Sequence, residues 1–437
     1  MSARETALQA LMACRTADAW SNSVLKDYIA RNRLDARDAG LASRLCYGVL
    51  QNRMKLDFYL SQLLKGKLRD LHPITRDVLH LGLYQLLELD RIPESAAVNE
   101  SVVLARKYVK NPTAPGLVNG VLRTAAREKG SLKAPTSYEE RYSHPAELIT
   151  LLKGSLPKGT LEPMLIAHNE APATVVQVNT LKTDAPSLLS RLTAEGVDAR
   201  PHLWMENALV LSGTGNLEQL PSFREGLMYV QDPAAKLSVL CADLPETGAR
   251  VLDCCSAPGG KSFAAAMVMG GRGEITSCDI HPHKVPLIEK GAERLGISCI
   301  TARCQDATQF VPQWEKEMDA VICDVPCSGL GIIRKKPDIR YKDLKETEEL
   351  PALQLRILRN QARYVRPGGT LLYSTCTVLK RENEAVVEAF LKENTDFYTE
   401  ALVLPERFGG NSTGMLTLIP GQHDTDGFFI CRLRRKA

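Results

Sequence analysis

The sequence lacks any uninterrupted apolar run that approaches the ~18 residues of a membrane span. Near the N-terminus, Arg4 and Glu5 precede an apolar stretch, Leu8–Met12, that is too short for the core of a secretory signal peptide. Internal repeats and low-complexity tracts are also missing from the 437 residues. We therefore expect a soluble, cytoplasmic protein that makes no membrane contact. Its length favours two or three domains of about 150 residues each.

Paired cysteine motifs are missing too, although the sequence holds 12 cysteines. Cys254 and Cys255 are adjacent, and Cys323 and Cys327 are four residues apart, so the C-x-x-C pairs of a zinc site do not occur. A chain of this length builds its core without disulfide bonds. We expect reduced thiols and no bound metal, with most cysteines in the core and one or two of them reactive.

Charge is present in ordinary amount but is unevenly distributed. The chain has 24% charged and 44% hydrophobic residues and a net charge of +4, which is typical of a folded protein. Residues 1–135 hold 21 Lys and Arg against 13 Asp and Glu, a net charge of +8, so the remainder carries −4. A basic N-terminal part favours contact with a polyanion, although a basic domain that binds no nucleic acid would give the same count.

The first part of the chain, residues 1–133, is predicted to form a bundle of about six helices. Apolar residues recur there at a spacing of four, which places each set on one helix face: Leu41, Leu45 and Val49; Leu79, Leu83 and Leu87. Residues 134–170 are rich in glycine and proline, and we interpret them as a connector with one short helix around Ala146–Lys153.

Residues 171–235 are predicted to form a small α+β module. Val175–Asn179 and Ala208–Leu211 are strand-like, and Ala185–Glu195 between them is helix-like. This module precedes a longer segment with a different and more regular pattern.

Residues 236–437 alternate strand, turn and helix, which predicts a parallel sheet with helices on both faces. The expected strands are Arg250–Cys254, Glu274–Asp279, Cys299–Cys304, Ala320–Asp324 and Thr370–Thr375, with helices at Lys284–Leu295 and Gln354–Tyr364. Gly414–Ile419 and Gly427–Leu433 are separated only by a turn and predict an antiparallel hairpin at the sheet edge. Such a hairpin is typical of S-adenosylmethionine (SAM) methyltransferases, whereas nicotinamide dehydrogenases usually continue with parallel strands.

The turn after the first of these strands is glycine-rich and opens a helix. Gly259 and Gly260 let the backbone approach a ligand, and the helix start presents unpaired N–H groups. The dinucleotide fingerprint G-x-G-x-x-G is absent. A P-loop is excluded as well, because its first glycine would fall on Cys255. The segment is therefore either a ligand-binding turn of another class or a tight turn that binds nothing.

Acidic residues follow the next two strands. Asp279 ends the second strand, where a carboxylate can accept hydrogen bonds from ribose hydroxyls. Asp306 lies just past the third strand and can meet an adenine edge. Either residue alone is more often a cap or a loop acid. Together at successive strand ends they favour a cofactor that contains adenosine.

Two cysteines follow the ends of the fourth and fifth strands, Cys327 beside Asp324 and Cys376 after Thr375. Because parallel strands end at the same edge of a sheet, we expect both thiols to lie near each other and near the cofactor. A thiolate can add to an unreactive carbon such as C6 of cytosine, which makes C5 able to attack a methyl group. Asp324 can hydrogen-bond the base at N3 and its amino group, while a second thiol assists release.

These motifs resemble those of the Sun family of RNA cytosine-C5 methyltransferases, in which Pro-Cys and Thr-Cys pairs accompany a sequence like Ala257–Lys261. Arg37–Leu50 and Val118–Arg123 resemble the NusB-like RNA-binding domain. Linked through Arg141–Pro145, the pairing is similar to bacterial small-subunit rRNA methyltransferases. The resemblance covers nearly the whole chain. It implies an all-α NusB-like bundle, a small α+β module and a C-terminal α/β Rossmann-like SAM methyltransferase domain with an antiparallel edge hairpin.

The resemblance also implies roles for the matching residues. SAM would be bound by Cys255, Ser256, Ala257, Pro258, Gly259, Gly260, Lys261, Asp279, Asp306 and Asp324. Cys376 would be the nucleophile and Cys327 would help to free the product, a choice that spacing alone leaves open. Lys261 would favour the thiolate or orient Asp324. Gln177 stands where relatives often have arginine, which leaves a phosphate or active-site contact at that position open.

The expected partner is RNA, specifically an unpaired or flipped-out cytosine of 16S rRNA, because the reactive face of a stacked base is inaccessible. Phosphate contacts are expected from the loop Arg334-Lys335-Lys336 and from Arg106, Lys107, Lys110, Arg123 and Arg127. We expect a monomer. Two other hypotheses stay open: an assembly or antitermination factor whose methyltransferase domain is inactive, and the same chemistry on tRNA.

Overall fold

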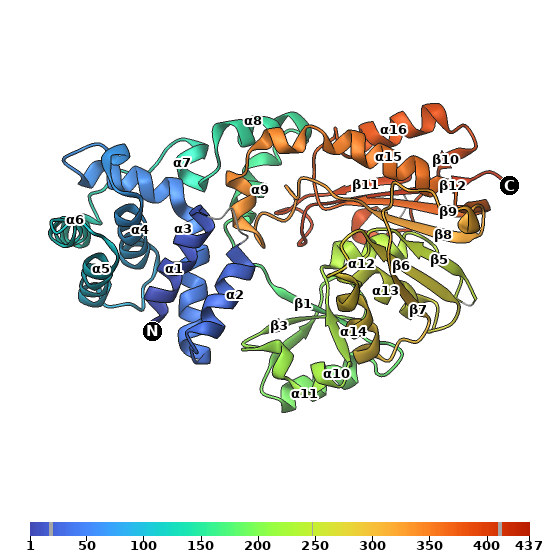
Figure 1. Cartoon of the computed structure of the whole chain (residues 1–437), viewed down its shortest axis with the longest axis horizontal. Helices are drawn as coiled ribbons and strands as arrows, with labels where there is room; N and C mark the ends of the chain where they lie inside the picture. The colour runs from blue at the N-terminus through green and yellow to red at the C-terminus, as the bar shows by residue number, and fades with distance from the viewer. Residues whose placement is uncertain (17–20, 247, 410–412) are drawn as a thin grey trace. The chain divides into compact units, whose positions relative to one another are not determined.

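The computed structural model describes residues 1–16, 21–246, 248–409 and 413–437 (Figure 1). Within it the chain divides into two units. The first unit consists of Met1–Leu151, Leu165–Glu170 and Ile333–Lys342, and the second of Leu152–Met164, Ala171–Ile332 and Asp343–Ala437. The boundaries of the four predicted domains stay a prediction. In the described part of the chain, every helix is too short or too polar to cross a membrane.

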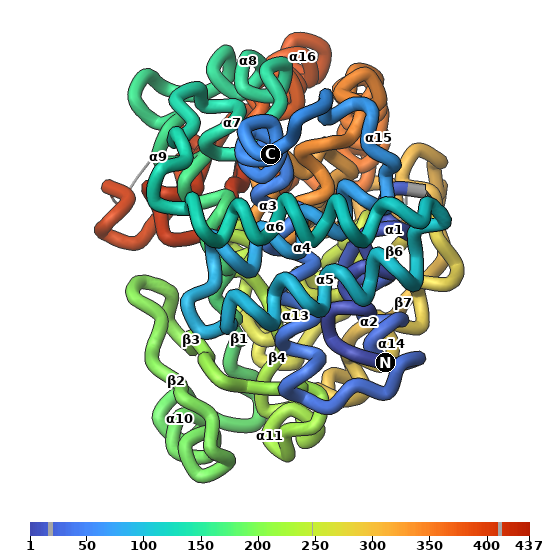
Figure 2. The backbone as a smooth tube through the Cα atoms, turned by 90° about the vertical axis from the view of Figure 1, so that its left-hand side faces the viewer, coloured from blue at the N-terminus to red at the C-terminus, as the bar shows by residue number. Residues whose placement is uncertain are grey.

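The first unit is helical, as predicted. Its bundle contains α1 (Ala3–Thr16), α2 (Ser21–Arg31), α3 (Ala36–Leu63), α4 (Pro73–Glu88), α5 (Glu94–Tyr108) and α6 (Ala114–Glu128), with a short 3-10 helix η1 (Leu68–Asp70). Leu45, Val49, Leu79 and Leu83 are buried in its core, which confirms the spacing argument. Figure 2 shows α5 and α6 running side by side in this bundle.

The segment interpreted as a connector contains more helix than predicted. We expected one helix, whereas the structure has α7 (Tyr138–Tyr142), α8 (Ala146–Ser155) and α9 (Leu161–Ala167). Ser137 caps α7 by accepting a hydrogen bond from the backbone N–H of Glu140 at 3.2 Å. Helix-breaking residues therefore mark the ends of these helices rather than a continuous loop.

A buried arginine holds the segment Ile333–Lys342 within the first unit. Arg340, in the 3-10 helix η4 (Pro337–Tyr341), is 1% exposed. Its guanidinium donates to the carbonyl oxygens of Gln51 (2.9 Å) and His168 (3.1 Å) and to Oδ1 of Asn169 (2.8 Å). These acceptors are uncharged, and burial lowers the pKa of Arg340 to about 10. The Gln51 carbonyl is available because α3 is kinked at Asn52 (φ −112°, ψ 16°).

After Leu152–Met164, the second unit continues with a small antiparallel sheet in the order β2-β3-β1-β4. Its elements are β1 (Thr174–Val178), α10 (Ala185–Ala194), β2 (Asp198–Pro201), β3 (Ala208–Ser212), η2 (Leu217–Gln219), α11 (Pro221–Arg224) and β4 (Met228–Val230). Leu188 and Leu192 of α10 pack on the sheet. The predicted α+β module is confirmed, and β2 and β4 are additions to it.

The larger sheet has the order β10-β12-β9-β8-β5-β6-β7, with β11 paired to β12. Its strands are β5 (Arg250–Asp253), β6 (Glu274–Asp279), β7 (Ile300–Cys304), β8 (Met318–Asp324), β9 (Val365–Thr375), β10 (Phe397–Thr399), β11 (Met415–Leu418) and β12 (Phe428–Arg435). The first five of these are parallel, whereas β10, β11 and β9 each pair antiparallel with β12. The predicted parallel sheet and edge hairpin are therefore confirmed.

Helices cover both faces of this sheet because buried residues alternate along its strands. Val251 belongs to a core shared with α12 (Pro233–Leu240), α13 (Gly260–Val268) and α14 (Val285–Leu295). Leu252 belongs to the opposite core, shared with α15 (Leu350–Ala362) and α16 (Glu384–Glu393). The 3-10 helices η3 (Pro312–Trp314), η5 (Leu344–Thr347) and η6 (Glu406–Phe408) lie in connecting loops. Because β5, β6, β8 and β9 pair in parallel, their carboxyl ends lie at one edge of the sheet.

Candidate functional site

The glycine-rich turn leads from β5 into α13, as predicted. Gly259 stands immediately before α13 with φ 111°, a conformation that side chains other than glycine rarely adopt. A Cβ at this position would also lie 2.4 Å from the Phe263 ring. The turn therefore requires glycine for both backbone and packing reasons.

A cavity of about 190 Å³ opens beside this turn. It is lined by Val230, Gln231, Ala235, Asp253, Cys255, Ser256, Ala257, Pro258, Gly260, Lys261 and Asp324. Two polar atoms at the cavity, Asp253 Oδ1 and Ser256 Oγ, are buried without a hydrogen-bond partner among the described residues. Burial raises the pKa of Asp253 to about 7, even though its Oδ2 accepts a hydrogen bond from Ser262 Oγ at 2.7 Å. The cavity thus offers unsatisfied polar groups to a ligand.

The cavity brings together part of the predicted cofactor set. Seven of the ten predicted residues line it, namely Cys255, Ser256, Ala257, Pro258, Gly260, Lys261 and Asp324, whereas Gly259, Asp279 and Asp306 do not. Asp279 Oδ1 accepts a hydrogen bond from the backbone N–H of His281 at 2.9 Å. Asp306 Oδ1 accepts from the N–H and hydroxyl of Thr308, both at 2.8 Å. Their contact with a cofactor stays a prediction.

The two predicted cysteines meet. The sulfur atoms of Cys327 and Cys376 lie 3.2 Å apart, and both side chains are partly exposed. The hydrogen bond with Cys376, together with burial, raises the pKa of the Cys327 thiol well above its usual range. Cys327 therefore keeps its proton and can donate it toward the Cys376 sulfur.

A charged pair forms part of the cavity lining. Lys261 Nζ, on α13, is 2.5 Å from Asp324 Oδ2 at the end of β8. The other carboxylate oxygen, Asp324 Oδ1, accepts a hydrogen bond from Ser374 Oγ at 2.9 Å. Ser374 is two residues before Cys376, so Asp324 joins the cavity lining to the strand that carries Cys376. A proton or a positive charge can be supplied at this point.

Four residues of the cavity lining were missing from the predicted set. Val230, Gln231 and Ala235 come from the end of β4 and from α12, far from the glycine-rich motif in sequence, and no motif marked them. Asp253 ends β5 directly before the motif, and its acidic side chain at a strand end was a usable signal. Gln177 is fully buried, and its side-chain N–H donates to the Gln231 carbonyl at 3.1 Å.

The basic residues predicted to contact phosphate divide into two groups by their exposure. Arg106, Lys107, Lys110, Arg123 and Arg127 are exposed on or beside α5 and α6. Arg334, Lys335 and Lys336 are partly buried and engaged in contacts. Their contact with phosphate stays a prediction.

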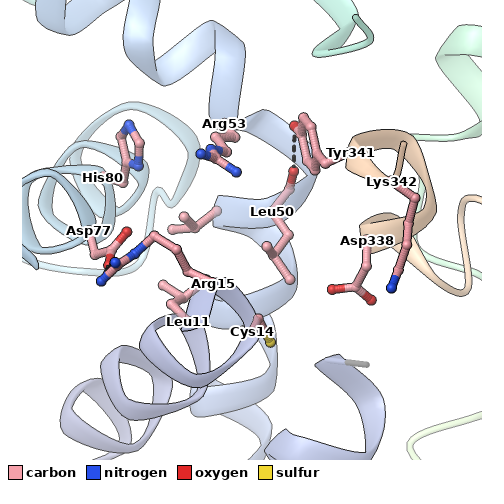
Figure 3. Close-up of a pocket in the computed structure, with 11 residues that line it drawn as sticks. Leu11, Cys14, Arg15, Leu50, Arg53, Asp77, His80, Asp338, Tyr341 and Lys342 are labelled. Atoms are coloured by element: carbon pink, nitrogen blue, oxygen red, sulfur yellow. Dashed lines mark hydrogen bonds and ion pairs between the residues drawn. The ribbon is translucent and has the colours of Figure 1, made fainter. Parts of the chain in front are cut away.

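The first unit also contains a polar cavity that the sequence did not predict (Figure 3). It measures about 340 Å³, and both Arg53 and Arg15 line it. The Arg53 guanidinium lies 5.3 Å from the centre of the Tyr341 ring, and Arg15 pairs with Asp77 at 3.1 Å.

Comparison with known families assigns three parts of the chain. Residues 241–434 match the family described as 16S rRNA methyltransferase RsmB/F. Residues 1–127 match the NusB family, and residues 144–218 match a ferredoxin-like domain of RsmF/B-like methyltransferases. These matches agree with the helical bundle, the small antiparallel sheet and the larger sheet described above.

Solved structures support the same fold. PH0851 has a TM-score of 0.81 at 24% identity and covers 99% of each chain. A methyltransferase homolog protein from Pyrococcus horikoshii has a TM-score of 0.56 at 25% identity, covering 67% of this chain and 99% of its own. NSun6 from the same organism, solved with SFG, has a TM-score of 0.60 at 20% identity, with 67% and 98% covered.

Relatives match over the full length. The probable ribosomal RNA small subunit methyltransferase B of Bacillus subtilis is 36% identical and covers 100% of this chain and 99% of its own length. The ribosomal RNA small subunit methyltransferase B of Klebsiella pneumoniae is 32% identical, with 93% and 92% covered. The chain therefore belongs to the ribosomal RNA small subunit methyltransferase B family.

Proposed function

We propose that this protein transfers a methyl group from SAM to C5 of a cytosine in 16S rRNA through a covalent adduct between Cys376 and C6 of the base. The observation that carries the proposal is the 3.2 Å separation of the Cys327 and Cys376 sulfur atoms at the strand ends beside the Lys261–Asp324 pair. Full-length similarity to small subunit rRNA methyltransferases supports the substrate class.

The cavity beside the glycine-rich turn fits SAM. Asp253 Oδ1 and Ser256 Oγ have no hydrogen-bond partner in the part of the chain that the structure describes and can bind polar groups of the cofactor, whereas Ala257 and Pro258 offer an apolar surface. Asp279 would hold the ribose and Asp306 the adenine edge, as at other strand ends of this fold class. When bound, SAM supplies an electrophilic methyl group.

The side chains divide the reaction among themselves. Cys376 loses its thiol proton to solvent, and the thiolate sulfur forms a bond to C6 while the C5–C6 π electrons move into the ring, which makes C5 nucleophilic. Asp324 accepts a hydrogen bond from the cytosine amino group, and the Lys261 ammonium stabilises negative charge that develops on the ring. After C5 is methylated it loses its proton to solvent, the electrons of the C5–H bond re-form the C5–C6 double bond, and the sulfur–C6 bond breaks with its electron pair on sulfur. The Cys327 thiol, whose pKa is raised, gives its proton to the departing Cys376 sulfur and then regains a proton from solvent.

The first unit is proposed to hold the rRNA rather than to react with it. The exposed Arg106, Lys110 and Arg123 can contact phosphates, which adds affinity and orientation without base recognition. In the first-unit cavity Arg53 can add positive charge, whereas Arg15 is paired with Asp77.

Two variants test the assignment of the cysteines. Cys376→Ala is expected to abolish methylation of 16S rRNA while SAM binding by calorimetry persists. Cys327→Ala is expected to accumulate an RNA–protein adduct that resists denaturation. Turnover by Cys376→Ala would contradict the nucleophile assignment, and absence of the adduct would contradict the release role. Bisulfite sequencing of treated 16S rRNA and tRNA identifies the product and decides between the two RNAs.

A further inference from the structure

Two adjacent residues just before α16, Glu382 and Asn383, pack beneath the cysteine loops. Both are 0% exposed. A carboxylate and an amide are costly to bury, and the cost is offset only when their polar atoms are hydrogen-bonded. The proposed chemistry assigns neither residue a part, so their partners indicate what they do.

Glu382 holds the loop that carries Cys327. Its Oε2 accepts hydrogen bonds from the backbone N–H of Ser328 (2.8 Å) and from Gln354 Nε2 (3.0 Å). The same Gln354 nitrogen donates to the carbonyl of Pro326 at 2.9 Å. The residues on either side of Cys327 are thus tied to one buried carboxylate.

Asn383 holds the loop that carries Cys376. Its Oδ1 accepts a hydrogen bond from Thr375 Oγ1 at 2.6 Å, and its Nδ2 donates to the carbonyl of Thr377 at 3.0 Å. The residues on either side of Cys376 are therefore tied to one buried amide. Ser328 Oγ donates to Thr377 Oγ1 at 2.9 Å, which links this loop to the Cys327 loop.

We propose that Glu382 and Asn383 are positioning residues that set the two sulfur atoms at their working separation, Glu382 through the Cys327 loop and Asn383 through the Cys376 loop. The proposal rests on the two-cysteine function proposed above and deepens it. Each residue holds a different loop through hydrogen bonds. Replacing Glu382 is therefore expected to slow a different step of the reaction from replacing Asn383.

The experiment compares four variants of the full chain on 16S rRNA with SAM: Glu382→Ala, Glu382→Gln, Asn383→Ala and Glu388→Ala. Glu388 is exposed on α16, the helix that directly follows Glu382 and Asn383, and serves as the matched control. Each variant is measured for kcat, for KM, for the fraction of denaturation-resistant RNA–protein adduct and for SAM affinity.

Variants of Glu382 and Asn383 are expected to behave differently. Glu382→Ala is expected to accumulate adduct and lose about tenfold or more in kcat, because a small misplacement of a reacting group has an effect of this size. Glu382→Gln keeps an oxygen that can accept both N–H groups and should restore release. Asn383→Ala should lose a similar factor in kcat without accumulating adduct. KM and SAM affinity should match those of Glu388→Ala.

The proposal is overturned if Glu382→Ala and Asn383→Ala behave like Glu388→Ala, or if both fail at the same step. If either variant fails to bind SAM, the same hydrogen bonds are removed by replacing the partner residue instead. Gln354→Leu should then accumulate adduct, and Thr375→Val should form less adduct. Wild-type behaviour of these two variants would overturn the proposal. Activity of Cys376→Ala would instead refute the proposed function itself.

Discussion

Replacing Asp253 by asparagine tests whether a carboxyl group at the cavity stays protonated in the folded protein. Asp253 is 0% exposed, and burial raises its pKa from 3.8 to about 7. The folded chain therefore holds a proton that the unfolded chain has already lost, over the window from about pH 4 to pH 7. In that window the folded state loses stability as pH rises. Asparagine carries no such proton, so the variant should not lose stability for this reason.

The size of the effect follows from the shift. Each pH unit in this window removes about 1.4 kcal/mol of folding free energy. Between pH 5 and pH 8 the wild type should lose about 3 kcal/mol relative to Asp253→Asn, since the loss ends near pH 7. For the second unit, which is larger than about 250 residues, that corresponds to a relative Tm change of about 5 °C in favour of the variant.

Scanning calorimetry from pH 5 to pH 8 measures this difference, and a shift on adding SAM identifies the transition of the second unit. Asp184→Asn is the control. Asp184 is exposed, and its hydrogen bonds with Ser187 lower its pKa, so it is ionised in both folded and unfolded states throughout this range. The difference in Tm between Asp184→Asn and the wild type should therefore be independent of pH. Parallel Tm curves for the wild type and Asp253→Asn would refute the claim that the folded protein protonates Asp253.

Three further predictions concern other contacts. Lys261→Met removes the ammonium beside Asp324 and should lower kcat for rRNA methylation about a hundredfold; a loss below about threefold would contradict its role. Mild treatment with hydrogen peroxide should join Cys327 to Cys376, with the peroxide reduced to water, because the sulfur atoms are 3.2 Å apart. Peptide mass spectrometry should detect the cross-link, dithiothreitol should restore activity, and oxidation elsewhere without this link would argue against the geometry. Arg340→Met leaves the oxygens of Gln51, His168 and Asn169 without their donor and should destabilise the first unit by about 3 kcal/mol. Hydrogen exchange of α3 peptides during urea titration measures this change, and unaltered protection would contradict it.

Local pattern predicted the larger sheet well, because its strands carry their own signal. The expected segment Glu274–Asp279 coincides with β6, where buried residues end in a strand-tip acid. In contrast, β10 (Phe397–Thr399) is three residues long and exists because it pairs with Arg435, Arg434 and Leu433 of β12. A pairing between distant segments leaves no period in either sequence.

The sequence also contains features that indicate α7 and α9, although the nearby glycine and proline residues favoured a loop. Pro163 is the third residue of α9, a position in the first turn where proline removes no hydrogen bond that the helix needs. Ser137 and Glu140 have the spacing of a capping box at the start of α7. Counting glycine and proline without their position in the helix produced the connector interpretation.

The residues of the candidate site also divide into those that the sequence predicted and those that it did not. Cys327 and Cys376 were predicted as neighbours because both follow the ends of adjacent parallel strands. Gln231 directly follows β4 of the small sheet. Glu382 lies 54 residues from Ser328, and its carboxylate accepts a hydrogen bond from the Ser328 backbone N–H. Such residues contribute through tertiary contacts, which one sequence does not reveal.

The first unit is assembled from three separate stretches of chain, and the last of them, Ile333–Lys342, follows the Cys327 motif. A protein truncated after residue 170 would lack Arg340 and would leave buried carbonyl oxygens in its interior without a donor. A protein that starts at residue 171 would carry the Arg340 guanidinium without the first-unit carbonyl oxygens that accept its hydrogen bonds. Dissecting the enzyme into an RNA-binding half and a catalytic half therefore requires grafting the ten-residue insert with the N-terminal half, rather than a single cut.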